Sequence, residues 1–385
     1  MARLYEDWIR TAMFRLDAET AHEVGINALR VGLGTEFARR KAEERYGGDP
    51  SCAVERFGLK FSSPAGVAAG FDKNGIVIDQ LAALGFGFVE VGTVTYKPQK
   101  GNKKPRLFRL PDDEALINRL GFNNDGAEAV ASRLRKIERR CVVGVNIGRN
   151  KDVPNEEATE NYLAAFDVVH GVADYIALNV SSPNTPNLRE LQGGESFEEL
   201  VRALTKRNLD LSGGRGKPPE GGNLNEKGTP NEEGPSRNLK PLLVKIAPDL
   251  SEGAIEEIVD VCLRMGIDGI IATNTTVSRE GLRTKNVQDF GAGGLSGRPL
   301  AKRSTEVIRQ IYRYSKGKMP IVGVGGVFDE NDAFEKLAAG ACLLQAYTGF
   351  VYVGPSYARD INLRLPRVLK ERGFSSIDAV VGSGA

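Results

Sequence analysis

Histidine and cysteine are scarce in this sequence, and their scarcity excludes several kinds of site. The 385 residues include two histidines, His22 and His170, and four cysteines. Two histidines so far apart do not supply a histidine-based metal centre or a Ser-His-Asp triad. No two cysteines form a CxxC pair, so we expect reduced thiols in or near the core, in a reducing compartment. No metal site is therefore expected.

The sequence also lacks a large excess of positive or negative charge, and it lacks long apolar runs. The formal net charge of +2 gives no reason to expect nucleic acid as a partner. No apolar run reaches the roughly 18 residues that a membrane-spanning helix needs. The first ten residues, MARLYEDWIR, carry charges where a signal peptide has an uninterrupted apolar core. These features predict a soluble globular protein.

From residue 64 onward, short apolar runs alternate with helical patterns. Eight runs are nearly continuous in Val, Ile, Leu and Ala, as in parallel strands covered on both faces; they span residues 64–70, 86–93, 141–148, 174–181, 241–248, 268–275, 320–326 and 341–348. Helical patterns occupy residues 75–84, 126–137, 158–169, 196–206, 251–265, 304–314 and 330–339, and a last one follows residue 355. The alternation predicts an α/β fold, a (β/α)8 TIM barrel over residues 46–385, with a doubly wound open sheet as the alternative.

Residues 1–45 do not share this alternation and suggest a helical pair. Apolar side chains recur at helical spacing from Leu4 to Leu16, and Asp17 is placed to cap a second helix over residues 21–33. Two interpretations stay open. The segment is either a helix pair packed on the barrel, or an amphipathic flap that contacts a membrane or a lipid-like substrate.

Residues 209–238 differ from the rest of the chain in composition. Leucines are the only large apolar residues in this glycine-, proline- and charge-rich stretch. Such a stretch buries too little apolar surface to offset its ordering entropy. It predicts a flexible surface insertion between the fourth barrel helix and the fifth strand.

Polar or glycine residues follow all eight predicted strands, at the end where a barrel of this kind carries its active site. In chain order they are Lys73, Thr93, Asn146, Asn179, Lys245, Thr273 with Asn274, Gly325 with Gly326, and Tyr347 with Thr348. A structural cap would explain one of them, but not eight. Two lysines at the same end of the barrel, which we call its mouth, predict an anionic ligand. The turns GVGG and AYTG occupy the usual phosphate-binding position of this fold.

The predicted mouth indicates redox chemistry by what it contains and what it lacks. It has no carboxylate pair for glycoside hydrolysis and no histidine base. Its asparagines suit a planar ligand with both hydrogen-bond donors and acceptors. Ser182, in the loop NVSSPNTPNL (179–188), is the natural base. A serine without a histidine is a weak base unless proton removal is coupled to a strong electron sink, which indicates a redox cofactor.

Longer motifs at these positions resemble one known family. They are AAGFDKNG (68–75), GTVTYKPQKGNKKPRLFRL (92–110), INRLGFNN (117–124), GVNIGRN (144–150), NVSSPNTPNLRELQ (179–192), VKIAPDL (244–250), NTT (274–276), GGLSGRPL (293–300) and GVGGV (323–327). From about residue 3 to about residue 370, outside the insertion, the chain resembles the dihydroorotate dehydrogenases, in particular the class 2, quinone-linked branch. The resemblance implies an FMN-dependent barrel that oxidises dihydroorotate to orotate in the synthesis of pyrimidines (UMP).

The resemblance also implies roles for individual residues. Ser182 would take the C5 proton of dihydroorotate while the C6 hydride passes to FMN, and Lys73 would lie between flavin and substrate. The substrate would further be held by Asn118, Arg119, Leu120, Gly121, Phe122, Asn179, Asn184, Asn274 and Thr275. FMN would be held by Ala69, Gly70, Phe71, Asp72, Lys73, Thr93, Asn146, Asn179, Lys245, Thr273, Gly297, Gly326, Tyr347 and Thr348, with Lys245 at the N1–O2 edge of the flavin.

Two features favour the class 2 branch. The loop carries serine where class 1 enzymes use cysteine as the base, and residues 1–45 match the helical extension of class 2. LDAETAH (16–22) resembles part of that extension, which would place His22 beside a quinone tunnel with Arg109 and Tyr347. The resemblance implies a peripheral protein on the cytoplasmic face of the cell membrane. The alternatives are a soluble class 1-like enzyme that uses fumarate or NAD, and a non-catalytic flavin-binding protein.

Overall fold

The structure is a computed structural model that describes residues 5–213 and 239–385. Most of the predicted insertion over 209–238 lies outside the described residues. Its first residues, 209–211, are the end of helix α8 (Gly194–Leu211), which runs five residues beyond the helix predicted over 196–206.

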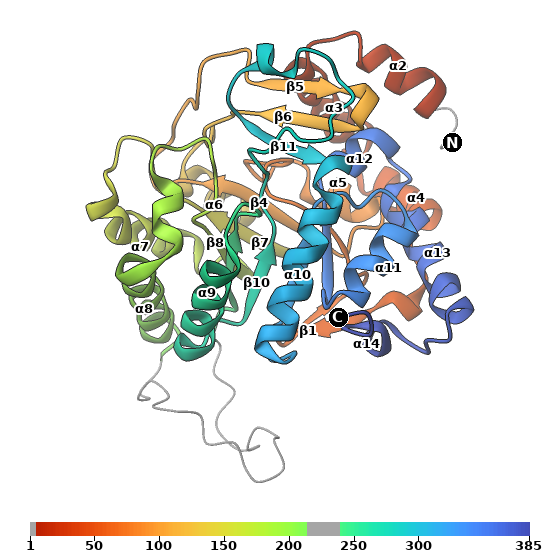
Figure 1. Cartoon of the computed structure of the whole chain (residues 1–385). Coiled ribbons are helices and arrows are strands. Elements are labelled where there is room, and N and C mark those ends of the chain that lie inside the picture. The colour runs from red at the N-terminus through yellow and green to blue at the C-terminus, as the bar shows by residue number, and fades with distance from the viewer. Residues whose placement is uncertain (1–4, 214–238) are drawn as a thin grey trace.

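Eight parallel strands close into a barrel, and neighbours in the barrel follow one another in chain order (Figure 1). They are β3 (Ala65–Val67), β4 (Phe88–Val94), β7 (Val142–Ile147), β8 (Tyr175–Asn179), β9 (Leu242–Ile246), β10 (Gly269–Ala272), β12 (Ile321–Val324) and β13 (Leu343–Ala346). Each overlaps a predicted run. The barrel is closed because β13 pairs with β3 in parallel, with Leu344 opposite Ala65. The (β/α)8 prediction is confirmed and the open sheet is wrong.

Helices cover the barrel from outside, and the strands between them are buried. The helices are α5 (Ile78–Ala83), α6 (Ala127–Leu134), α7 (Ala158–Val169), α8, α9 (Glu252–Met265), α10 (Ala301–Ser315), α11 (Glu330–Ala338) and α13 (Tyr357–Glu371), each at a predicted position. All residues of the eight barrel strands are buried. This two-sided burial is why the strands are continuous apolar runs rather than alternating ones.

A three-stranded antiparallel sheet lies over the mouth of the barrel, and the sequence analysis did not predict it. It consists of β5 (Leu107–Leu110), β6 (Ala115–Asn118) and β11 (Gly294–Gly297), in the order β11-β6-β5 (Figure 1). A small apolar cluster of its own holds it together.

The remaining elements are short. They are β1 (Val54–Arg56) paired with β2 (Leu59–Phe61), α12 (Thr348–Val353), α14 (Ile377–Val380) and the 3₁₀ turns η2 (Pro50–Cys52), η3 (Pro111–Asp113), η4 (Asn155–Glu157), η5 (Leu188–Gln192), η6 (Val287–Phe290) and η7 (Arg298–Leu300).

The N-terminal segment forms η1 (Tyr5–Ile9), α2 (Arg10–Met13), α3 (Ala18–Gly32) and α4 (Glu36–Tyr46). The predicted cap is confirmed, because the Asp17 carboxylate accepts hydrogen bonds from the backbone N–H groups of Glu19 and Thr20. A buried ion pair of 2.6 Å between Glu19 and Arg106 ties α3 to the loop before β5. Helix α4 was not foreseen as a separate element, and its buried Tyr46 belongs to the barrel's own core.

Three further expectations concern thiols, metals and membranes. All four cysteines are unpaired, and three of them are buried, which confirms the prediction of reduced core or near-core thiols. Within residues 5–213 and 239–385, no cluster of three or more His, Cys, Asp or Glu is arranged to hold a metal ion. None of the helices in that part of the chain is both long and apolar enough to span a membrane.

Candidate active site

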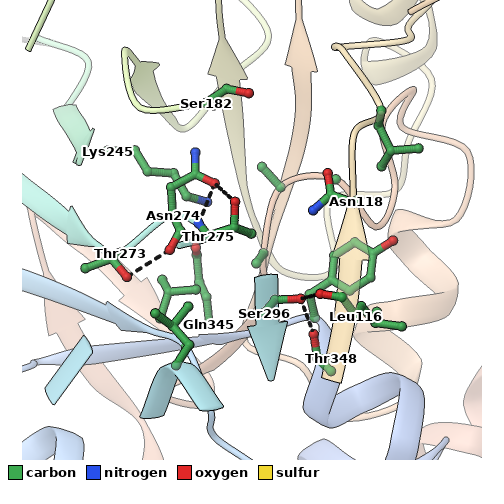
Figure 2. Close-up of a pocket in the computed structure, with 18 of the residues that line it drawn as sticks. Leu116, Asn118, Ser182, Lys245, Thr273, Asn274, Thr275, Ser296, Gln345 and Thr348 are labelled. Atoms are coloured by element: carbon green, nitrogen blue, oxygen red, sulfur yellow. Dashed lines mark hydrogen bonds between the residues drawn. The ribbon is translucent and has the colours of Figure 1, made fainter. Parts of the chain in front are cut away.

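One cavity at the C-terminal ends of the barrel strands brings together most of the predicted site residues (Figure 2). The predicted residues that line it are Ala69, Gly70, Lys73, Thr93, Asn118, Leu120, Gly121, Phe122, Asn179, Ser182, Asn184, Lys245, Thr273, Asn274, Thr275, Gly297, Gly326, Tyr347 and Thr348. The mouth sheet contributes a further wall through Leu107, Leu116 and Ser296. Residues more than two hundred positions apart in the chain therefore face one space.

Three side chains predicted for the site have their contacts elsewhere. The Arg119 guanidinium donates to the carbonyls of Phe290 and Ala292 and so braces the loop before β11. The Asp72 carboxylate accepts from the backbone N–H groups of residues 76 and 77, at 2.9 and 2.8 Å, and so fixes the turn before α5. Phe71 lines a second cavity, described below. The first cavity is lined by the neighbouring residues Gly70 and Lys73, but not by the side chains of Phe71, Asp72 or Arg119.

A chain of hydrogen bonds fixes the orientation of the amides at the strand ends. Asn274 Nδ2 donates to Asn179 Oδ1 at 3.2 Å and to Ser181 Oγ at 2.9 Å. Asn179 Nδ2 donates in turn to Thr93 Oγ1 at 2.8 Å. Asn146 stands behind the cavity wall, where its Oδ1 accepts from Thr93 Oγ1 at 2.5 Å. Buried polar groups tied together in this way hold one orientation, which suits a ligand bound in a single pose.

Ser182 lies on the loop after β8, 5% exposed, and faces the cavity. Its Oγ accepts from the backbone N–H of Asn184 at 3.2 Å. The Asn184 side chain crosses to the mouth sheet and donates to Asn118 Oδ1 at 3.2 Å. In Figure 2, Ser182, Lys245 and Asn274 come from one side of the pocket and Asn118 from the other. A small polar ligand bound between these two sides could form hydrogen bonds with the Ser182 hydroxyl and with the amides of Asn118 and Asn274.

Two lysines supply the positive charge of the cavity. Burial lowers the pKa of Lys73 to about 8. Its ammonium makes no hydrogen bond or close ion pair with any residue that the structure describes, and it lines the cavity. Lys245 Nζ lies 3.6 Å from Glu90 Oε1. An unpaired, partly desolvated ammonium favours an anionic ligand group.

Two glycines that line the cavity, Gly326 after β12 and Gly297 at the end of β11, are required by close packing of the protein around them. Gly326 has φ +72°, and a Cβ there would lie 2.4 Å from the Cβ of Ala301. Gly297 has φ +101°, and a Cβ there would lie 2.3 Å from a backbone oxygen. The hydroxyls of Ser296 and Thr348, 2.8 Å apart, line the same end of the cavity. Turns after the seventh and eighth strands are the usual phosphate site of this fold, so the position fits a phosphate-bearing cofactor.

The barrel interior contains two polar residues that the sequence analysis missed. Glu90 on β4 is fully buried, and Gln345 on β13 is 1% exposed and lines the cavity. Gln345 Oε1 is buried without a hydrogen-bond partner among the described residues, so it is open to an N–H group of a bound planar ligand. Each interrupts an otherwise apolar run, VEV and LLQA, and that interruption was the available signal.

A second, mostly apolar cavity adjoins the first. It lies between α3, the segment η1–α2 and the mouth sheet, and it contains His22, Arg109 and Tyr347, the three residues predicted for a quinone site. Leu107, Leu116 and Tyr347 line both cavities and so form the wall between them. Burial, assisted by the charge of Lys73, lowers the pKa of His22 to about 3, so its imidazole is neutral at neutral pH.

The fold and its cavities define a (β/α)8-barrel enzyme in which a polar, cation-lined site adjoins an apolar one. The family model of dihydroorotate dehydrogenase matches residues 51–369 of this chain. A protein named dihydroorotate dehydrogenase (quinone) from Roseiflexus castenholzii is 47% identical, over 98% of this chain and 96% of its own. One of the same name from Christiangramia forsetii is 45% identical, over 94% and 98%. The chain belongs to the dihydroorotate dehydrogenase family, which is flavin-dependent.

Solved structures agree with this assignment. The crystal structure of DHODH in complex with ferulenol from Eimeria tenella superimposes with a TM-score of 0.80 at 37% identity, and the match covers 95% of each chain. The ligand-free form from the same organism matches with a TM-score of 0.79 at 35% identity.

Proposed function

We propose that this protein oxidises (S)-dihydroorotate to orotate in the de novo synthesis of UMP, with FMN as cofactor and a membrane quinone as electron acceptor. The observation that carries the proposal is the wall that the two cavities share. A polar cavity that contains Ser182 adjoins an apolar cavity at His22, with Tyr347 common to both. This arrangement suits two half-reactions with substrates of opposite polarity.

The polar cavity is suited to hold dihydroorotate in one pose. Its amides, from Asn118, Asn184 and Asn274, offer donors and acceptors to the ring N–H and C=O groups. The Lys73 ammonium, without a protein partner among the described residues, is available to the substrate carboxylate. Fixed orientation of the reacting atoms supplies a large part of the rate enhancement in reactions of this kind.

Ser182 takes the proton from C5 of the substrate in this proposal. Its Oγ is fixed by the N–H of Asn184 at 3.2 Å, which holds the hydroxyl in one place for the C5 proton. The serine ends neutral because its own hydroxyl proton passes to water as the C5 proton arrives. FMN held by this site would supply the electron sink that the C6 hydride needs, with quinone as the final acceptor. The described part of the site contains no histidine within reach of Ser182, so the coupling to hydride loss is what makes serine sufficient.

The FMN phosphate would be held at the turn that contains Gly326, beside Gly297 and Thr348, all three of which line the cavity. Lys245 supplies positive charge at the edge of the flavin where electron density increases on reduction. Thr93, Asn179 and Thr273 border the same space. Asn146 acts behind them through its hydrogen bond to Thr93.

The apolar cavity suits the quinone, and the N-terminal segment suits a membrane surface. Trp8 is 73% exposed and Val31 is 77% exposed, and neither packs on the barrel. Ile9 and Val24 are also exposed, yet they line the cavity itself. A bilayer in contact with these side chains would deliver quinone directly to His22 and Tyr347. We therefore propose a peripheral protein on the cytoplasmic face of the membrane, where dihydroorotate is available.

Anaerobic mixing tests the proposal. The purified holoprotein is mixed with dihydroorotate while the flavin absorbance is followed, and a short-chain ubiquinone is then added. Bleaching followed by rapid recovery is the expected result. Bleaching without recovery by quinone would refute the acceptor, and fumarate and NAD would then be tried. A flavin that dihydroorotate does not bleach would refute the substrate.

A further inference from the structure

Glu90 is the most deeply buried charged side chain near the site. It lies on β4, in the middle of a strand whose residues are all buried, and its own exposed fraction is zero. A carboxylate in such a position is costly unless hydrogen bonds and a cation compensate it. Four neighbours provide that compensation.

All four neighbours are hydrogen-bond donors. Asn146 Nδ2 donates to Glu90 Oε1 at 2.9 Å, and Lys245 Nζ lies 3.6 Å from the same oxygen. Tyr175 Oη donates to Oε2 at 3.0 Å, and Gln345 Nε2 donates to Oε2 at 2.7 Å. Glu90 is the acceptor in all three hydrogen bonds, and the ammonium adds a positive charge, so this environment suits a carboxylate group.

The partners of Glu90 connect it to the cavity from three sides. Lys245 and Gln345 line the cavity directly, and Asn146 bonds Thr93, which also lines it. The Lys245 side chain is 6% exposed, and the Glu90 side chain not at all, so water screens their interaction little. Glu90 therefore forms an ion pair with the Lys245 ammonium, and its negative charge offsets the positive charge of the lysine on this side of the cavity.

We propose that Glu90 is a positioning residue that fixes the Lys245 ammonium against the cofactor and, by its own charge, lowers the midpoint potential of the bound flavin. This inference rests on the proposed function, because it takes flavin to occupy the cavity that Lys245 lines. Reduction adds electron density to the flavin, and a nearby cation favours it while a buried anion opposes it. With Glu90 ionised, the flavin holds its electrons less tightly and gives them more readily to the quinone.

Glu90→Gln tests the charge with little change of shape. The readout is the two-electron midpoint potential of the bound flavin, from an anaerobic dithionite titration against a reference dye. We expect retained flavin and a more positive potential, equivalent to at least a tenfold change in the ratio of reduced to oxidised flavin, or about 30 mV for a two-electron couple. Tyr175→Phe is the matched control, since it removes one hydrogen bond to Glu90 but leaves the charge, and its shift should be much smaller.

A double-mutant cycle of Glu90→Gln and Lys245→Met distinguishes an effect that Glu90 exerts through Lys245 from a direct effect of its charge on the flavin. If Glu90 acts through Lys245, the shifts from the two substitutions do not add in the double variant. If Glu90→Gln does not fold, Glu90→Asp takes its place, because it keeps the charge but withdraws it from Lys245 by one methylene group. A potential unchanged in the flavin-loaded Gln or Asp variant would overturn the proposal, as would equal shifts in Glu90→Gln and Tyr175→Phe.

The titration uses no dihydroorotate and no quinone. A failure of the proposed reaction, which would appear as wild-type flavin that dihydroorotate does not bleach, is therefore distinguishable from a failure of this inference.

Discussion

The imidazole of His22 stacks on the phenol ring of Tyr347, with ring centroids 6.4 Å apart and planes inclined by 14°. Tyr347 lines both cavities, whereas His22 lines only the apolar one. Burial raises the pKa of Tyr347 and lowers that of His22, so both rings are uncharged at neutral pH. Tyr347, directly after the last barrel strand, thus belongs to the wall between the two cavities, and His22 of the N-terminal segment packs on the apolar side of that wall.

The lowered pKa of His22 predicts a pH-dependent stability. The unfolded chain takes up this proton below about pH 6.5, whereas the folded protein does so only near pH 3, so the stability from this group is full above pH 6.5 and is lost on acidification. From about pH 7 to about pH 5 the loss amounts to about 2 kcal/mol. Urea unfolding of the wild type and His22→Phe at both pH values measures it. The variant should lose about 2 kcal/mol less than the wild type, and equal losses would contradict a histidine that stays neutral in the folded protein.

Lys73 predicts a different pH dependence, in substrate affinity. Its pKa of about 8 means that the free site loses its ammonium as the pH rises above that value. The dissociation constant of orotate should therefore rise above about pH 8, whereas in Lys73→Met it should be about 10- to 100-fold higher at neutral pH and insensitive to this titration. Equilibrium titration of the flavin spectrum with orotate gives both values. Lys60→Met, an exposed lysine on β2, is the control and should behave as wild type.

The barrel was predictable from the sequence, and the mouth sheet was not, for one physical reason. Barrel strands are buried on both faces and so appear as continuous apolar runs, such as 241–248. Strands β5 and β6 have only four residues each, LFRL and ALIN, and the third strand, from residues 294–297, pairs with β6 from far along the chain. No local pattern carries that information.

The position of the site was predictable, but several individual roles were not. The rule that chemistry lies at the strand ends located Ser182, Lys73 and Lys245 at one cavity. Asp72 belongs to the same motif as Lys73, yet its carboxylate binds backbone N–H groups. A short sequence does not distinguish a ligand contact from a local hydrogen bond of this kind. Glu90 was missed because its partners come from four other strands and meet only inside the barrel.

The glycine turn predicts a sharp loss of cofactor on adding one methyl group. In Gly326→Ala, the new Cβ would lie 2.4 Å from Ala301 Cβ, at a φ of +72° that alanine adopts poorly. Overpacking of this size costs about 1–3 kcal/mol unless the turn moves, and because the turn lines the cavity, its displacement should raise the dissociation constant of FMN by about tenfold or more. Fluorescence titration of the apoprotein with FMN measures it. Gly171→Ala, where nothing lies within 4 Å, is the matched control, and similar losses in both variants would contradict a role for the turn.

Ser182→Ala should separate catalysis from cofactor binding. Loss of a general base reduces the rate by about 10²–10⁴-fold, so flavin reduction by dihydroorotate should slow by that factor while FMN stays bound. Stopped-flow absorbance under anaerobic conditions measures the rate. Ser132→Ala is the control, because Ser132 is exposed on α6 and does not line the cavity. Reduction that is unimpaired in Ser182→Ala would assign the base elsewhere.

The N-terminal segment is better tested by point substitution than by deletion of residues 1–45. That deletion would also remove Glu19 from its buried ion pair with Arg106, and Ala42 from the barrel core. Loss of both half-reactions would then follow from damage to the fold. Single exposed apolar residues avoid this ambiguity, and Trp8, 73% exposed on η1, is the largest of them.

Trp8→Ser should weaken binding to phospholipid vesicles by about tenfold or more, because insertion of a large apolar side chain contributes about 1.5–3 kcal/mol. Reduction of a long-chain quinone embedded in the vesicles should slow, while flavin reduction by dihydroorotate and oxidation by a water-soluble short-chain quinone stay unchanged. Vesicle sedimentation and the two acceptor assays measure these effects. Leu263→Ser, which alters a 40% exposed leucine on α9, is the control. If both variants bind vesicles as the wild type does, the exposed apolar side chains of this segment do not contact the bilayer, and quinone must reach His22 through water.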